Sequence, residues 1–165
     1  MKAFSRWMVF GLLLTLASSM AEIHPLSKLM DFMGDSYASG RLPDGYSDAE
    51  VTGRPAVSGD LLRFLNKLEA QKKKDFKKFV MESEEYADLS ENKRKAIAKD
   101  PKRALGVPFL VQIEKVYKIF RHGKRVGYVY RAADHVEAAM IQDGAGMDIY
   151  VDTNFKVIGT TEWTA

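Results

Sequence analysis

Residues 111–130, VQIEKVYKIFRHGKRVGYVY, decide the fold class of this chain. Apolar residues alternate with polar ones on both sides of a short central stretch, at Val111, Ile113, Tyr117 and Ile119 before it and at Val126, Tyr128 and Tyr130 after it. The central residues 122–124 are His-Gly-Lys, and glycine is favoured in tight turns. Because successive side chains of a strand point to opposite faces, this pattern predicts a β-hairpin.

The residues that follow the hairpin predict two more strands. Apolar residues alternate over 147–151, a turn sequence follows at 152–154, and residues 157–163 fit a further strand. Residues 134–142 fit either a short helix or an irregular crossover. We therefore expect an antiparallel sheet of about four strands within residues 109–163.

The first half of the chain predicts helices. Apolar residues recur at steps of three and four, at Leu26, Leu29, Met30, Met33 and Tyr37, and this spacing predicts one helix within residues 22–39. Residues 40–59 contain four glycines and two prolines and are expected to form a Gly/Pro-rich loop or linker. Residues 60–106 hold further helices, and residues 60–165 form a single domain. The expected fold is α+β, with the N-terminal helices packed on one face of the C-terminal antiparallel sheet.

The alternation also predicts which side chains face the helices. The expected core residues of the sheet are Ile119, Val126, Tyr128, Ile149, Val151 and Val157, all on one face. Asp148 and Asp152 are expected on the opposite face, where their replacement should cost little stability.

The first 21 residues have the three zones of a secretory signal peptide. Lys2 and Arg6 supply the positive charge, residues 7–17 are mostly apolar, and small residues stand at Ser19 and Ala21. The apolar run is shorter than the roughly 20 residues that a membrane-spanning helix needs, so we expect cleavage of residues 1–21 and no membrane span afterwards. The chain has no cysteine and hence no disulfide, which favours a bacterial envelope and a periplasmic or secreted location.

Charge argues against nucleic acid as a partner. The net charge is +3, but without residues 1–21 the chain has 23 basic and 22 acidic residues. The lysine run at 72–78 belongs to a segment, 72–103, with eleven basic and seven acidic residues. Phe76 and Phe79 share the apolar side of that helix, so the run is interpreted as a solvated helix face rather than a nucleic-acid surface.

No motif for catalysis or metal binding is complete. The histidines are His24, His122 and His135, and they lack the three or four convergent ligands of a metal site. Ser90 and Lys93 match a Ser-x-x-Lys motif without its companion motifs, and Ser90 is interpreted as a helix cap. We therefore predict no catalytic residue and no metal, and we expect Met30 and Met33 to pack in a core rather than to bind haem.

Three segments resemble the FMN-binding domain family. They are residues 116–120 (VYKIF), 123–130 (GKRVGYVY) and 144–159 (GAGMDIYVDTNFKVIG), and the likeness extends over 116–163. The resemblance implies a sheet that carries a flavin, with Gly144 and Gly146 matching a family glycine loop as candidate cofactor-binding residues. Residues 160–165 contain neither the family's Glu-Thr-Pro-Gly-type turn nor the threonine that can bond to the flavin phosphate.

These observations favour a non-enzymatic exported protein that binds an envelope protein or a small ligand, without a cofactor, through its sheet or its 40–59 loop. The alternative is an FMN-binding-like redox accessory protein of the cell envelope. An enzyme of another type is disfavoured because no nucleophile or ligand cluster is present. The ligand, the partner and the oligomeric state are not specified by any motif.

Overall fold

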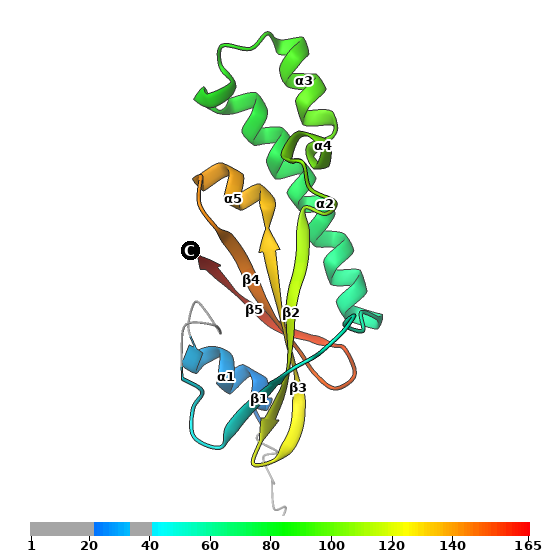
Figure 1. Ribbon diagram of the computed structural model, residues 1–165, viewed down its shortest axis with the longest axis vertical. Coiled ribbons are helices and arrows are strands. Elements are labelled where there is room, and N and C mark those ends of the chain that lie inside the picture. Colours follow the sequence, from blue (N-terminus) through cyan, green and yellow to red (C-terminus); the bar gives the residue numbers. More distant parts are fainter. Residues whose placement is uncertain (1–21, 34–40) are drawn as a thin grey trace, which may run out of the picture.

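The core of the fold is a five-stranded antiparallel sheet with strand order β1-β2-β3-β4-β5 (Figure 1). The structure is a computed structural model that describes residues 22–33 and 41–165, so the predicted signal peptide at 1–21 lies outside the described residues. The strands are β1 (Tyr46–Glu50), β2 (Val111–Arg121), β3 (Lys124–Asp134), β4 (Ala145–Val151) and β5 (Val157–Thr164). Each strand pairs with its neighbour in sequence, and the predicted hairpin is β2–β3, with His122 and Gly123 at positive φ in its turn.

The predicted α+β fold is confirmed, but the sheet has five strands rather than four. The additional strand is β1, which lies inside the segment 40–59 predicted as a loop. It pairs with β2 from Tyr46 opposite Arg121 to Glu50 opposite Tyr117. Its sequence, YSDAE, has no apolar alternation because this edge strand is mostly exposed and is selected by pairing with β2.

The helices are α1 (Pro25–Met33), α2 (Gly59–Glu82), η2 (Glu84–Tyr86), α3 (Glu91–Lys99), α4 (Pro101–Leu105) and α5 (His135–Ile141). Residues 134–142 were predicted to form either a short helix or an irregular crossover, and they contain the helix α5. The Asp134 carboxylate begins α5 by accepting bonds from the Val136 and Glu137 N–H groups at 3.1 and 3.0 Å. Gly106, in the left-handed conformation, ends α4.

The helices cover both faces of the sheet, which corrects the prediction of a single packed face. α1 packs on one face against Ile119, Val129 and Tyr150. α2 packs on the other face, where its N-terminal half contacts a cluster that includes Ile149 and Val151. The expected one-sided core is therefore divided between two cores.

The division has a local cause in the backbone. Ile119 and Val126 belong to the α1 face, whereas Tyr128, Ile149, Val151 and Val157 belong to the α2 face. The β2–β3 pairing shifts register twice, between Ile113 and Lys115 and between Ile119 and Phe120. Such an irregularity reverses the in-and-out alternation, which a strict two-residue period cannot represent.

Asp148 and Asp152 do not occupy the exposed positions predicted for them. The Asp148 side chain is fully buried, on the same face of β4 as Tyr150. Its cross-strand neighbours are Arg131 of β3 and Thr161 of β5. Asp152 lies in the turn after β4, where its carboxylate accepts bonds from the Asn154 and Lys156 N–H groups at 2.8 and 2.9 Å. The predicted exposed face was wrong for Asp148, because α1 covers the second face of the sheet and makes it an interior.

Two buried tyrosines, one on each face, predict a loss of stability in alkali. Burial raises the pKa of both Tyr130 and Tyr150 to about 12, and the Thr161 hydroxyl offsets only part of this effect at Tyr150. The folded state therefore keeps two protons that the unfolded chain loses near pH 10. The free energy of unfolding should be unaffected by these groups below pH 10 and fall by up to about 2–3 kcal/mol per tyrosine as pH rises to 12.

Urea denaturation at a series of pH values, with tyrosinate absorbance recorded in parallel, measures this effect. Tyr150→Phe should remove about half of the alkaline loss, because one of the two titrating groups is gone. A free energy of unfolding that stays constant from pH 10 to 12 would contradict the burial of these hydroxyls.

Candidate functional site

Three polar side chains of α2 attach this helix to the sheet. Near its N-terminus, the Asp60 carboxylate accepts a bond from the Val157 N–H of β5 at 3.1 Å, and this bond lowers the Asp60 pKa. Further along, Glu69 accepts bonds from the N–H groups of Leu110 and Val111 at 3.1 and 3.2 Å. The third attachment, Lys72, lies just before the helix passes the end of the sheet.

Lys72 forms an ion pair with Asp134 at the junction of β3 and α5. The side chains are only 13% and 4% exposed. Burial by itself would lower the Lys72 pKa, but the hydrogen bond and the charge of Asp134 outweigh it and raise the pKa. Asp134 thus serves two helices, because one carboxylate oxygen caps α5 and the other holds Lys72. This pair sets the position from which the rest of α2 projects.

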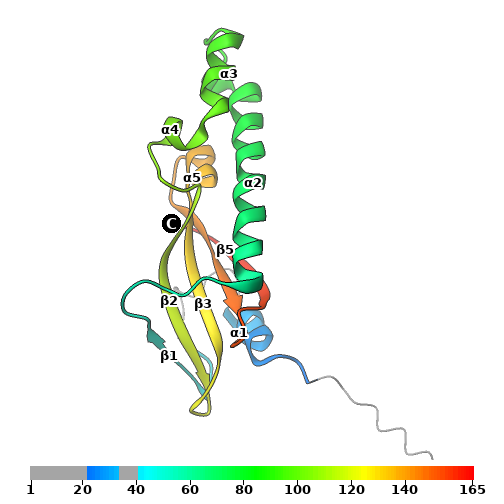
Figure 2. The same ribbon diagram turned by 90° about the vertical axis from the view of Figure 1, so that its right-hand side faces the viewer.

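Beyond Lys72, α2 continues with η2, α3 and α4 as a helical arm that projects past the sheet (Figures 1 and 2). We call residues 73–105 the arm. Its base has a separate apolar cluster with the buried members Phe76, Val80, Ala98, Leu110 and Val136. At the far end, the Arg94 guanidinium of α3 donates to the Met81 carbonyl of α2 at 2.9 Å. α2 and α3 are therefore held together both at the base of the arm and at its far end.

A groove with basic walls lies between α2 and the segment α3–α4. Its lining residues are Lys73, Lys74, Lys77, Lys95 and Lys99, with Met81, Ala98 and Pro101 supplying apolar surface. Its volume is about 520 Å³. We call it the lysine groove. The five ammonium groups come from two segments that run alongside each other in the α2–α3 hairpin, so the tertiary structure adds Lys95 and Lys99 to the three groove lysines of the run at 72–78.

Most lysines of this groove have no carboxylate partner. Lys95 pairs with Glu91 at 2.6 Å, one turn earlier on α3. Lys73, Lys74, Lys77 and Lys99 are exposed and form no ion pair within residues 22–33 and 41–165. Three other lysines of these helices are paired, Lys72 with Asp134, Lys78 with Glu82, and Lys102 with Glu69, whereas Lys67 and Lys93 form no ion pair among the described residues. The predicted pairing of opposite charges is therefore present on the arm, but within the groove it involves only Lys95.

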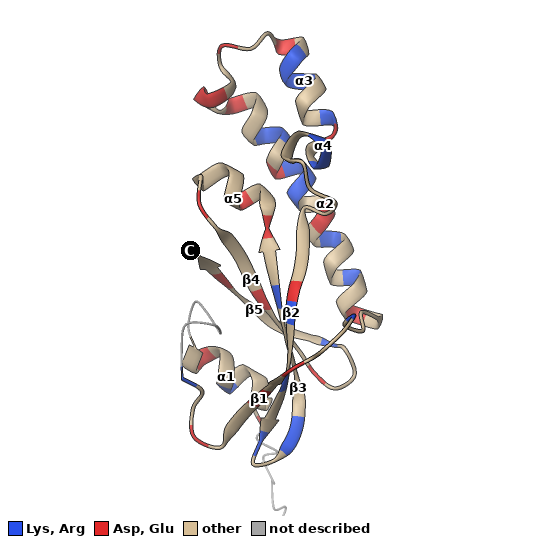
Figure 3. Cartoon of the chain, viewed as in Figure 1, with Lys and Arg blue, Asp and Glu red and all other residues tan. Residues whose placement is uncertain are grey.

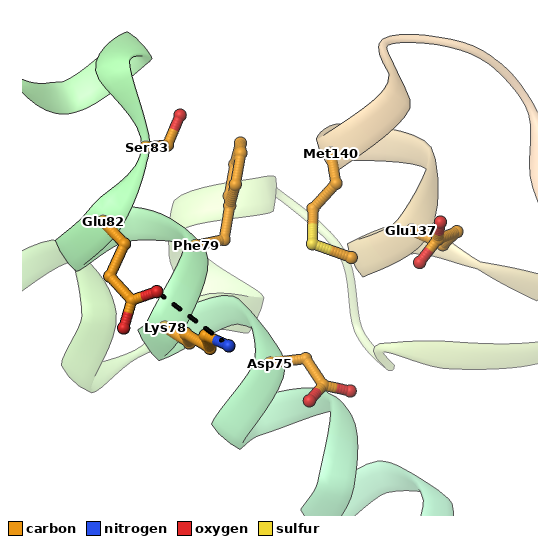
Figure 4. Close-up of a pocket in the computed structure, with 7 residues that line it drawn as sticks. All are labelled: Asp75, Lys78, Phe79, Glu82, Ser83, Glu137 and Met140. Carbon is orange, nitrogen blue, oxygen red and sulfur yellow. Dashed lines mark ion pairs between the residues drawn. The ribbon is translucent and has the colours of Figure 1, made fainter.

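The opposite side of α2 carries the opposite charge (Figure 4). A pocket of about 540 Å³ between α2 and α5 is lined by Asp75, Glu82 and Glu137 around the apolar side chains Phe79 and Met140. Lys78 approaches Glu82 at 4.0 Å along its edge. α2 thus separates an acidic pocket from the lysine groove, and the two surfaces face different directions.

The predicted cofactor-binding glycines lie at the start of β4 and do not border the lysine groove. Gly144 accepts a bond from the Ala165 N–H at 2.9 Å. Gly146 lies within β4, opposite Ala133 and Trp163, and a Cβ built on it would be 2.2 Å from both the Ala132 carbonyl oxygen and the Trp163 ring. The Trp163 ring is covered in turn by the Arg131 guanidinium, 4.3 Å from the ring centroid. The space beside Gly146 is filled by side chains of this chain.

The other residues noted in the sequence have structural positions. His24 accepts a bond from the Leu26 N–H at the start of α1, His122 lies against Gly45 in the β2–β3 turn, and His135 contacts Gln112. Ser90 precedes α3 at the N-cap position without a side-chain capping bond, and Lys93 is exposed. The described part of the chain contains no cluster of three or more His, Asp or Glu side chains arranged to hold a metal ion. Among the described helices, none has the length and apolarity needed to cross a membrane.

The sequence indicated only some of the lysines that line the groove. The run at 72–78 was evident in the sequence. The turn between α2 and α3 places Lys95 and Lys99 beside it, and the Lys72 side chain is buried instead of lining the groove. Comparisons with protein-family models, with curated proteins and with solved structures found no match.

Proposed function

We propose that this chain is an exported, non-enzymatic interaction protein that binds an acidic segment of a partner protein in the lysine groove. The observation that supports this most directly is the set of four exposed lysines without carboxylate partners, Lys73, Lys74, Lys77 and Lys99. Like charges held close together repel one another, and a carboxylate-rich partner would relieve that repulsion. The partly exposed side chain of Met81 would contact aliphatic side chains of the same segment.

Features of the arm favour a protein segment over nucleic acid or a lipid surface. Phe76 is fully buried and Phe79 faces the acidic pocket, so neither offers a stacking platform beside the lysines. The large apolar side chains that are exposed in the described residues, Ile23, Phe32, Leu62, Phe109 and Ile141, all lie outside residues 73–105. An arm that inserted into a membrane would need such side chains beside its basic face.

The alternative is an FMN-binding-like redox accessory protein, in keeping with the resemblance of residues 116–163. A flavin bound near Gly144 and Gly146 would have to lie where Ala165 and Trp163 contact these glycines. The geometry thus adds no observation in favour of a flavin. Flavin absorbance in the purified protein would distinguish this alternative, because the interaction proposal predicts none. Export and a periplasmic or secreted location remain part of the proposal and depend on the sequence of residues 1–21.

Isothermal titration with an acidic amphipathic helical peptide of Glu and Leu tests the groove. The variant Lys73→Gln/Lys74→Gln/Lys77→Gln should bind this peptide about tenfold more weakly or worse, since three charge contacts of modest strength are lost. The matched control Lys28→Gln/Lys67→Gln/Lys124→Gln removes the same charge from exposed positions outside the groove and should bind nearly as well as the parent. If both variants lost the same peptide affinity, the effect would come from net charge alone, and binding in the groove would be contradicted.

A further inference from the structure

We infer that the acidic segment bound by the lysine groove is the tip of the arm of a second copy of this chain, in a symmetric dimer. This inference rests on the proposed function and names its partner. We define the acidic tip as residues 82–91, at the far end of the arm. In the cartoon of Figure 3, acidic residues mark this end, and basic residues follow on α3 and on the part of α2 closer to the sheet.

The tip and the groove carry unpaired charges of opposite sign. Within the described residues, the tip has two internal ion pairs, Glu82 with Lys78 and Glu91 with Lys95. Glu84, Glu85 and Asp88 are exposed and form no ion pair there. Three unpaired carboxylates of the tip therefore correspond to the unpaired lysines of the groove, which are Lys73, Lys74, Lys77 and Lys99. One chain cannot bring the two sets together, because they lie at different levels of the same rigid hairpin.

An antiparallel arrangement of two arms brings both sets together at once. Lys73, Lys74 and Lys77 precede Met81 by about one to two helical turns, and Glu84 and Glu85 come three and four residues after it, in η2. A two-fold axis beside Met81 would place the tip of each copy at the groove of the other, giving two identical contacts. Met81 would then contact its own counterpart near the axis, where a flexible thioether side chain adapts well to a symmetric contact.

The shape of the molecule permits this contact. The arm projects past the sheet, so two arms can lie alongside each other while their sheets point away in opposite directions (Figures 1 and 2). A two-fold contact also closes on itself and yields dimers rather than filaments. The interface would be polar and salt-sensitive, since its main contacts are between exposed charges.

A charge-reversal experiment tests the inference. The first variant, Lys73→Glu/Lys74→Glu/Lys77→Glu, makes the groove acidic, and the second, Glu84→Lys/Glu85→Lys/Asp88→Lys, makes the tip basic. In light scattering at low salt, the parent should be a dimer, and each variant by itself should dissociate at least about tenfold more readily. Mixing the two variants should restore a dimer of one copy of each, because every groove then meets a tip of opposite charge. Circular dichroism melts check that the variants fold.

Three results would overturn the inference: a parent that is monomeric at low salt, a dimer that survives both reversals, or a mixture that stays monomeric. A dimer that survives both reversals would point instead to an exposed sheet edge such as β5. If the parent is monomeric but still binds the acidic peptide in the groove, the proposed function stands and only the identity of the partner fails. If the parent neither dimerises nor binds the peptide, both proposals fail.

Discussion

Replacing Lys72 with methionine should lower the free energy of unfolding by about 3–5 kcal/mol, the usual cost of removing one member of a buried ion pair. Asp134 would keep its two capping bonds to α5 but would remain a buried carboxylate without its cation. The apolar stem of methionine preserves most of the packing of the lysine side chain. The loss in free energy of unfolding therefore comes from the missing charge rather than from a cavity. Urea denaturation followed by circular dichroism measures it.

Lys78→Met is the matched control for this change. Lys78 lies on the same helix and pairs with Glu82, but both side chains are largely exposed. Removal of an exposed pair typically costs about 0–1 kcal/mol. The double variant Lys72→Met/Asp134→Asn should recover part of the loss, because no unpaired charge is then left in the interior. Equal costs for Lys72→Met and Lys78→Met would show that the Lys72–Asp134 pair is not a principal attachment of α2.

Replacing Gly146 with alanine should lower the free energy of unfolding by about 3 kcal/mol, because the new methyl group overlaps atoms that cannot move easily. One of these atoms is the Ala132 carbonyl oxygen in the adjacent strand β3, and the others belong to the Trp163 ring. Backbone atoms in the middle of a sheet cannot withdraw without breaking the pairing of β3 with β4. Trp163 is the only tryptophan after residue 21, so its fluorescence follows the local disruption directly.

Gly144→Ala provides the comparison within the same glycine loop. A Cβ on Gly144 would meet the Cβ of Ala165 at 2.8 Å, and Ala165 is exposed and lies outside β5. The expected cost is below about 1 kcal/mol. A large loss for Gly146→Ala with a small one for Gly144→Ala means that Gly146 is required for strand packing. If both variants lost only a little stability, the close contact of Trp163 with β4 would be contradicted. Space for a ligand beside Gly146 would then have to be considered again.

Local patterns were sufficient for most of the secondary structure. The β2–β3 hairpin follows from alternation around His122 and Gly123, and the strand at 147–151 was predicted by the same period. The helix within 22–39 follows from apolar spacing, and Ser90 correctly predicted where α3 begins although its side chain makes no capping bond. These features depend on residues a few positions apart, and each is therefore present in the sequence as a short-range signal.

The sequence by itself thus determined the α+β class, the central hairpin and the helices of the first half. Only the tertiary structure decided the edge strand β1, the second covered face that buries Asp148, and the division of the lysine run into one interior and several surface residues. The physical reason is the same in all three cases. Pairing of β1 with β2, docking of α1 on β4, and contact of Lys72 with Asp134 join residues that are far apart in the chain. The same long-range geometry places Lys95 and Lys99 of α3 opposite Lys73 and Lys77 of α2, and it creates the groove on which the proposed function depends.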